Sequence, residues 1–206
     1  MRDATEAEAR LLDAAVVAGG LGAKYTQPHR AYHNLLHVED VLLRIEELAP
    51  PQEDELALAL AAWFHDAVYQ PERDDNEERS AYAAYDALEQ AGASPKLMAE
   101  VMRLIRLTAT HEADTDDIAG AVLCDADLAI LGAPREKYVQ YAQGIRQEYV
   151  HVPMTAYHAG RTQVLRAFLD REHIYSTTYG REHWQTRARE NIEAEIACFD
   201  ADSDPL

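Results

Sequence analysis

The sequence predicts an all-α fold of about eight or nine helices, and three observations support that prediction. Residues that interrupt helices are sparse, since the 206-residue chain contains only 9 Gly and 8 Pro. Ala, Leu, Glu and Arg, which favour helices, are plentiful. Apolar residues recur at helical spacing, and no alternating stretch is long enough to support a sheet.

Start and stop signals divide the chain into successive helices joined by short loops. Pro50-Pro51 ends one helix, Asn76 is expected to cap the start of another, and Ser94-Pro95 is a cap followed by proline at the first helical position. Thr155 is expected to cap a further helix, whereas the glycine-rich segment 19–28 is expected to be a loop. The helices are expected over about residues 4–17, 31–48, 53–68, 76–90, 95–109, 117–131, 134–150 and 155–171, and from 181 to the acidic tail.

Length and composition fit a single domain, residues 1–206, because the chain is 48% apolar and long enough to bury a sizeable core. The net charge of −18, from 19 basic and 37 acidic residues, repels nucleic acids and anionic membranes. We therefore expect no nucleic-acid polymer as a partner. No apolar run reaches the ~18 residues of a membrane span, and the charged N-terminus lacks the apolar stretch that is typical of a signal peptide. A cytoplasmic location is expected, and Cys124 and Cys198 are expected to be small core residues.

The adjacent pair His65-Asp66 is the strongest functional signal in the chain. It follows the apolar run Ala61–Phe64, which should be buried. A buried carboxylate beside an imidazole is costly unless something compensates, and a metal ion often does. His33 and His37 lie upstream at helical spacing, but Asn34 replaces the glutamate of a zinc-protease helix, so that class is not expected.

The chain resembles the HD superfamily of metal-dependent phosphohydrolases. The resemblance rests on the order His, His-Asp, Asp, and covers roughly residues 25–175. Within the superfamily, the chain is most similar to a bacterial group of predicted phosphohydrolases without a settled substrate. This implies an HD-like helical bundle with a metal-binding core over about 25–132 and C-terminal helices 134–200 packing on it. It also implies hydrolysis of a small phosphorylated substrate, with nucleotides among the candidates.

The resemblance assigns the metal ligands to His37, His65, Asp66 and Asp127. His37 matches the family's upstream histidine better than His33, because it directly precedes Val38–Val41. Asp127 is chosen because the second aspartate of an Asp-x-Asp pattern is the usual ligand, with Asp125 as the alternative. Two imidazoles and two carboxylates suit Mn, Fe, Co, Ni or Mg as the divalent ion, and zinc is a further candidate.

Other residues are candidates for completing the chemistry. Glu77, His111 and His33 are the candidates for orienting water or moving protons. Arg30, Tyr32 and Arg146 are the candidates for binding the substrate, because arginine offers bidentate donors to phosphate. Each of these residues has an ordinary structural alternative, such as a surface or packing role.

Two other functions stay open at this point. A di-iron oxygenase on the same scaffold would need further ligands, and His111 is the only histidine between Asp66 and Asp127. A binding module of the HD fold without catalysis would use the same residues structurally. The Val68-Tyr69 pair stands where alarmone hydrolases carry Glu-Asp, which argues against that substrate. The sequence does not decide the substrate or the metal. It also leaves open whether the protein is a monomer or a homo-oligomer.

Overall fold

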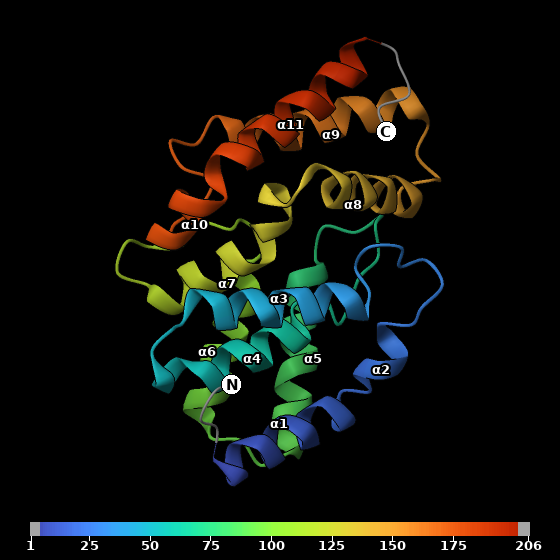
Figure 1. Ribbon diagram of the computed structural model, residues 1–206. Helices are drawn as coiled ribbons and strands as arrows, with labels where there is room; N and C mark the ends of the chain where they lie inside the picture. The colour runs from blue at the N-terminus through green and yellow to red at the C-terminus, as the bar shows by residue number, and fades with distance from the viewer. Residues whose placement is uncertain (1–4, 202–206) are drawn as a thin grey trace. The chain divides into compact units, whose positions relative to one another are not determined.

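The computed structural model describes residues 5–201, and every regular element within them is helical (Figure 1). The α-helices are α1 (Glu6–Ala18), α2 (Leu21–Lys24), α3 (Leu35–Leu48), α4 (Glu55–Phe64), α5 (Asn76–Gln90), α6 (Pro95–Leu107), α7 (Ile118–Leu128), α8 (Arg135–Glu148), α9 (Met154–Leu169), α10 (Thr178–His183) and α11 (Gln185–Asp200). Two 3₁₀ helices, η1 (Gln52–Asp54) and η2 (Ala129–Gly132), complete the set. The all-α prediction is confirmed. Among the described helices, none is long and apolar enough to cross a membrane.

The expected count of eight or nine helices is wrong, because two short helices were missed. The four-residue helix α2 lies in the segment that was expected to be a loop. The expected last helix is interrupted at Trp184, which ends α10 and precedes α11. Short helices of this kind are set by tertiary packing more than by local propensity, so a sequence pattern does not specify them.

Two predicted caps are also wrong. Helix α9 begins at Met154 with Pro153 as its N-cap, so Thr155 lies inside the helix. Asn76 is the first residue of α5, and its buried side chain bonds both the backbone N–H and the carbonyl of Gln70 at 3.0 and 2.9 Å. It therefore closes the turn before α5. By contrast, Ser94 caps α6 as expected, with its Oγ accepting from the N–H of Leu97.

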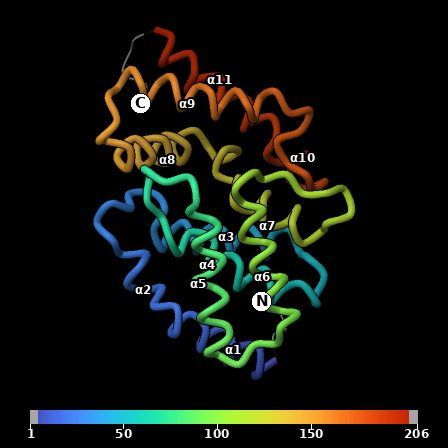
Figure 2. The backbone as a smooth tube through the Cα atoms, turned by 180° about the vertical axis from the view of Figure 1, so that it is seen from behind, coloured from blue at the N-terminus to red at the C-terminus, as the bar shows by residue number. Residues whose placement is uncertain are grey.

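The chain divides into two compact units, residues 1–127 and 128–206. In the first, α4 is the central helix and contacts α1, α3, α5 and α6. Figure 1 views α4 from the side of α3, and Figure 2 views the same unit from the side of α5 and α6. Helix α4 can occupy the centre because residues 57–62 are all buried, many of them alanines that allow close helix packing.

The second unit is organised around α11, which packs on η2, α9 and α10. The buried side chain of Asn191 donates to the carbonyls of Leu131 and Ala133, at 2.8 and 3.0 Å. These bonds satisfy carbonyls at the end of η2 that have no helical partner. A buried ion pair between Arg161 on α9 and Glu195 on α11 joins these two helices.

Gly132 is required for close packing in this second unit, and its replacement gives a direct test. A Cβ there would lie 2.6 Å from the Cβ of Trp184 and 2.8 Å from its carbonyl oxygen. Because backbone must then move, Gly132→Ala is expected to lower the free energy of unfolding by about 1–3 kcal/mol in urea denaturation. Gly160 in α9 is the control, since a Cβ there meets nothing within 4 Å. Gly160→Ala is expected to raise stability by about 0.5–1 kcal/mol, and an equal loss in both variants would contradict this account.

Candidate metal centre

Three segments of residues 1–127 bring titratable side chains together. Helix α3 begins at Leu35, because the side chain of Asn34 accepts from the N–H of Leu36 at 2.9 Å and so caps the helix. His37 therefore lies in the first turn of α3, whereas His33 precedes the helix. The expectation that His33 and His37 share one helix face is wrong, because the helix starts later than the predicted residue 31.

His65 and Asp66 lie just beyond α4, which ends at Phe64 instead of near residue 68. His65 is the C-cap residue, and Asp66 belongs to the following turn. The helical rotation between neighbouring side chains no longer applies after the helix ends, so both side chains can face one point. The third segment is α7, which carries both Asp125 and Asp127 near its C-terminal end.

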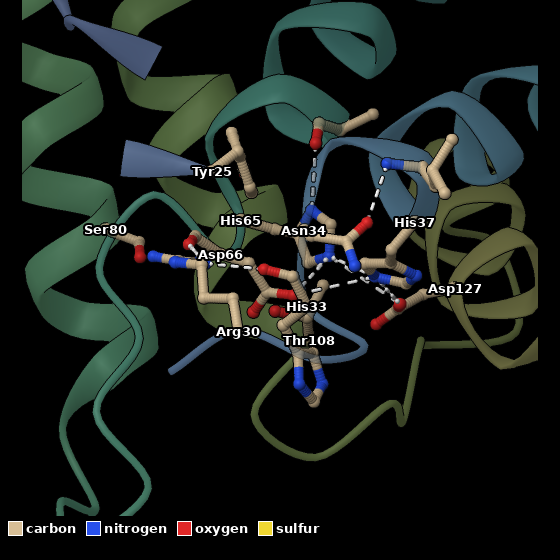
Figure 3. Close-up of polar contacts among 12 residues, drawn as sticks. Tyr25, Arg30, His33, Asn34, His37, His65, Asp66, Ser80, Thr108 and Asp127 are labelled. Atoms are coloured by element: carbon tan, nitrogen blue, oxygen red, sulfur yellow. Dashed lines mark hydrogen bonds and ion pairs between the residues drawn. The ribbon is translucent and has the colours of Figure 1, made fainter. Parts of the chain in front are cut away.

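The imidazoles of His37 and His65 and the carboxylates of Asp66 and Asp127 converge (Figure 3). The two Nε2 atoms of the histidines lie 3.1 Å apart. His37 Nε2 lies 3.1 Å from Asp127 Oδ1 and 3.5 Å from Asp66 Oδ2. His65 Nε2 lies 3.2 Å from Asp66 Oδ2 and 3.6 Å from Asp127 Oδ1. Donor atoms of His37, His65 and Asp127 all lie within 4.8 Å of one another, and Asp66 Oδ2 approaches both imidazoles without belonging to that group. Asp127, where Asp125 was the alternative, is the aspartate of α7 in the group.

These separations fit the coordination sphere of a divalent ion. Ligand atoms about 2.1 Å from a metal lie about 3.0 Å apart at right angles and about 3.4 Å apart in a tetrahedron. The five separations in the cluster span 3.1–3.6 Å. His37 and His65 are buried, and the side chains of Asp66 and Asp127 are each 14% exposed. The two carboxylates therefore keep some contact with solvent.

The ring of His65 is oriented for binding a metal. Its Nδ1 lies 2.9 Å from the carbonyl oxygen of Ala62, one turn back on α4. A carbonyl can only accept, so Nδ1 carries the hydrogen and donates it. In the neutral ring the lone pair is then on Nε2, which points into the cluster. Metal-binding histidines typically have this arrangement, with the second nitrogen donating to a backbone carbonyl.

The electrostatics of the cluster are those of strongly coupled opposite charges. Burial by itself would lower the pKa of His65, but the carboxylates of Asp66 and Asp127 outweigh it and raise that pKa well above its usual value. Burial would likewise raise the pKa of Asp127, but His65 and hydrogen bonds from the neighbouring imidazoles hold it well below the usual range. Burial would also raise the pKa of Asp66, but chiefly His65 holds it below its usual range. Both carboxylates are therefore ionised, as metal ligands must be, and a bound ion would replace a proton on His65.

His111 supports Asp127 from the outer side. Its Nε2 lies 2.8 Å from Asp127 Oδ2, the carboxylate oxygen that does not make the short contact with His37. The backbone of His111 has a φ of 52°, in the left-handed region that non-glycine residues rarely adopt. This conformation ends the helical turn after α6 and aims the imidazole at α7. The predicted catalytic candidate thus contacts a ligand directly.

The remaining predicted residues fall into three groups. Tyr32 and His33 lie beside the cluster, with ring centroids 4.9 and 5.7 Å from that of His37. Glu77 is in the first turn of α5, and no hydrogen bond or ion pair within the described residues joins it to the ligands. Arg146 belongs to the unit 128–206, where its guanidinium donates to the carbonyls of Tyr149 and Val152.

Arg30 is buried against the backbone of the segments that carry the candidate ligands. Its guanidinium donates to the carbonyl oxygens of His33, Asp66 and Ala67, at 2.8, 2.9 and 3.3 Å. These contacts could not be read from the sequence, because a backbone acceptor leaves no mark on residue identity. In the structure the guanidinium also lies near the rings of Tyr25 and Tyr69.

Comparison of the sequence with models of known protein families gave no match, and searches of curated proteins and of solved structures gave no significant match. The function has to be inferred from the chemistry of the site.

Proposed function

We propose that this protein is a metal-dependent phosphohydrolase with an HD-like helical bundle. In this proposal His37, His65, Asp66 and Asp127 hold one divalent ion. The observation that supports it most strongly is that Nε2 of His37 and Nε2 of His65 lie 3.1 Å apart and 3.1 and 3.6 Å from Asp127 Oδ1. Asp66 Oδ2 lies 3.5 and 3.2 Å from the same two nitrogens. The orientation of His65 by the Ala62 carbonyl adds independent support, because it frees Nε2 for a metal.

The mixed nitrogen and oxygen donors suit Mn, Fe, Co, Ni or Mg, with zinc as a further candidate. A bound divalent ion would polarise a phosphoryl oxygen and lower the pKa of a water molecule, the two effects that phosphate-ester hydrolysis requires. The contact between His111 Nε2 and Asp127 Oδ2 favours one ion over two, since it occupies that oxygen with a protein group. We assign proton transfer to His33, because its ring lies beside that of His37.

A small phosphorylated molecule is the proposed substrate. Residues 1–127 hold 26 of the 37 acidic residues and 10 of the 19 basic residues, so this unit carries most of the net charge. A polyanionic polymer would be repelled by that field. A single phosphate group can still be attracted at short range, because a bound ion dominates the field within a few ångströms.

Metal loading gives the first test. Saturation at 100 times the dissociation constant stabilises a protein by about 2.7 kcal/mol, which is roughly 5–10 °C in Tm for a chain of this size. We expect such a rise with Mn²⁺, Co²⁺ or Ni²⁺ in protein treated with chelator, and phosphate release from a panel of phosphomonoesters, phosphodiesters and nucleotides. Glu77→Gln serves as a control that should preserve the rise in Tm.

The number of bound ions per chain, taken together with phosphate release, distinguishes this proposal from the binding module and the oxygenase. One bound ion with no hydrolysis of any ester would favour a binding module without catalysis. Two iron ions per chain would favour an oxygenase. No rise in Tm with any divalent ion would contradict the metal centre itself.

A further inference from the structure

We infer that Arg30 is a positioning residue of the metal centre, which sets the separation of the ligand-bearing segments, and that it does not bind the substrate. This inference rests on the proposed metal centre. Arg30 lies in the segment before α3, and its side chain crosses to the turn that follows α4. The two segments are those that carry His37 and the His65-Asp66 pair.

The guanidinium joins the two segments through backbone acceptors. Nη1 donates both to the carbonyl of His33, at 2.8 Å, and to the carbonyl of Asp66, at 2.9 Å. Nη2 donates to the carbonyl of Ala67 at 3.3 Å. Nη1 of Arg30 therefore links the backbone of His33, four residues before His37, to the backbone of Asp66.

The carbonyls of Asp66 and Ala67 need such a donor. Helix α4 ends at Phe64, so carbonyls beyond it have no helical N–H to accept from. An unpaired buried carbonyl is costly, and a positive charge is favourable at a helix C-terminus. Arg30 supplies both the donors and the charge, which explains why a fully ionised group is tolerated in a nearly buried position.

Further contacts fix the plane of the guanidinium. Nε donates to the side-chain oxygen of Gln27 at 3.1 Å. The Cζ atom lies 5.1 Å from the ring centroid of Tyr25 and 5.5 Å from that of Tyr69. Tyr25 is itself fixed, because its hydroxyl donates to the carbonyl of Trp63 on α4.

The arrangement has a consequence for metal binding. The distances among the ligands depend on the spacing between the start of α3 and the turn after α4, and Arg30 determines that spacing. Groups that orient metal ligands through hydrogen bonds typically change metal affinity about 10–100-fold when they are replaced. Lysine keeps the charge but lacks the planar fork, so it cannot reach both segments in the same geometry.

The test is a titration of chelator-treated protein with Co²⁺, followed by visible absorption, which reports the coordination geometry as well as the affinity. In Arg30→Lys we expect affinity at least about 10-fold weaker than in the wild type, with an altered spectrum. Where hydrolysis is measurable, kcat is expected to fall with little change in KM. Arg106→Lys is the matched control, since Arg106 pairs only with exposed groups such as Glu78, and should leave affinity and spectrum unchanged.

A milder variant keeps the test decisive if Arg30→Lys does not fold. Gln27→Ala removes only the acceptor of Nε and should shift the affinity in the same direction, by a smaller factor. Unchanged Co²⁺ affinity and spectrum in both variants, or a raised KM alone in Arg30→Lys, would overturn the inference while leaving the metal centre intact. Absence of Co²⁺ binding by the wild type would instead overturn the proposed function.

Discussion

Asp127→Asn is expected to weaken the binding of a divalent ion by at least about 100-fold and to reduce hydrolysis by a similar factor or more. Asparagine keeps the shape of the side chain but removes the negative charge beside His37 and His65. It also places an amide where Asp127 Oδ1 and Oδ2 now contact His37 and His111. Isothermal titration with Mn²⁺ or Co²⁺ and a phosphate-release assay measure the two effects.

Asp125→Asn is the matched control for this variant. Asp125 lies on the same helix, α7, and is buried, but it does not belong to the group of His37, His65 and Asp127 whose donor atoms converge. We expect Asp125→Asn to keep metal affinity within a few-fold of the wild type. A larger loss of affinity in Asp125→Asn than in Asp127→Asn would reverse the assignment of the ligand.

Glu195→Ala is expected to give the largest loss of stability, about 3–5 kcal/mol. The carboxylate of Glu195 accepts from Arg161 Nε at 2.9 Å, and the two side chains are only 1% and 9% exposed. It also accepts a hydrogen bond from the hydroxyl of Tyr138 at 2.5 Å. Removing the carboxylate leaves the guanidinium as a buried charge without its counter-ion, which costs far more than losing an exposed pair.

Urea denaturation followed by fluorescence of Trp184 measures this loss within residues 128–206. The Glu195→Ala variant and the protein it is compared with should both carry Trp63→Phe, so that Trp184 alone supplies the fluorescence. A separate unfolding transition of residues 1–127 then does not distort the curve measured for residues 128–206. Glu193→Ala is the control, because Glu193 is exposed on the same helix. A difference between the two variants below about 1 kcal/mol would contradict the role given to the buried pair.

The fold class could be predicted from the sequence because helical periodicity and the scarcity of Gly and Pro act over the whole chain. The helix boundaries that depend on tertiary contacts could not be predicted from the sequence. The end of α4 at Phe64 depends on tertiary contacts, such as those of Tyr25 with the carbonyl of Trp63 and of Arg30 with the carbonyl of Asp66. The short helix α2 is likewise too brief for any periodic pattern.

His65 and Asp66 were accessible from the sequence because an imidazole and a carboxylate directly after an apolar run are unusual. His37 and Asp127 were assigned only through the resemblance in ligand order. The groups that hold the candidate ligands in place could not be predicted from the sequence. The carbonyl of Ala62, which orients His65, and the carbonyls that bind Arg30 belong to the backbone and have no residue signature. The left-handed backbone of His111 is equally invisible, because histidine carries no glycine-like signal for positive φ.

The most direct measurement of the central claim is the anomalous scattering of crystals of the protein loaded with Mn²⁺ or Co²⁺. We predict one strong peak per chain, about 2.0–2.3 Å from Nε2 of His37, Nε2 of His65, and oxygens of Asp66 and Asp127. A peak at another position, or no peak under saturating metal with the four side chains placed as they are here, would contradict the proposed metal centre.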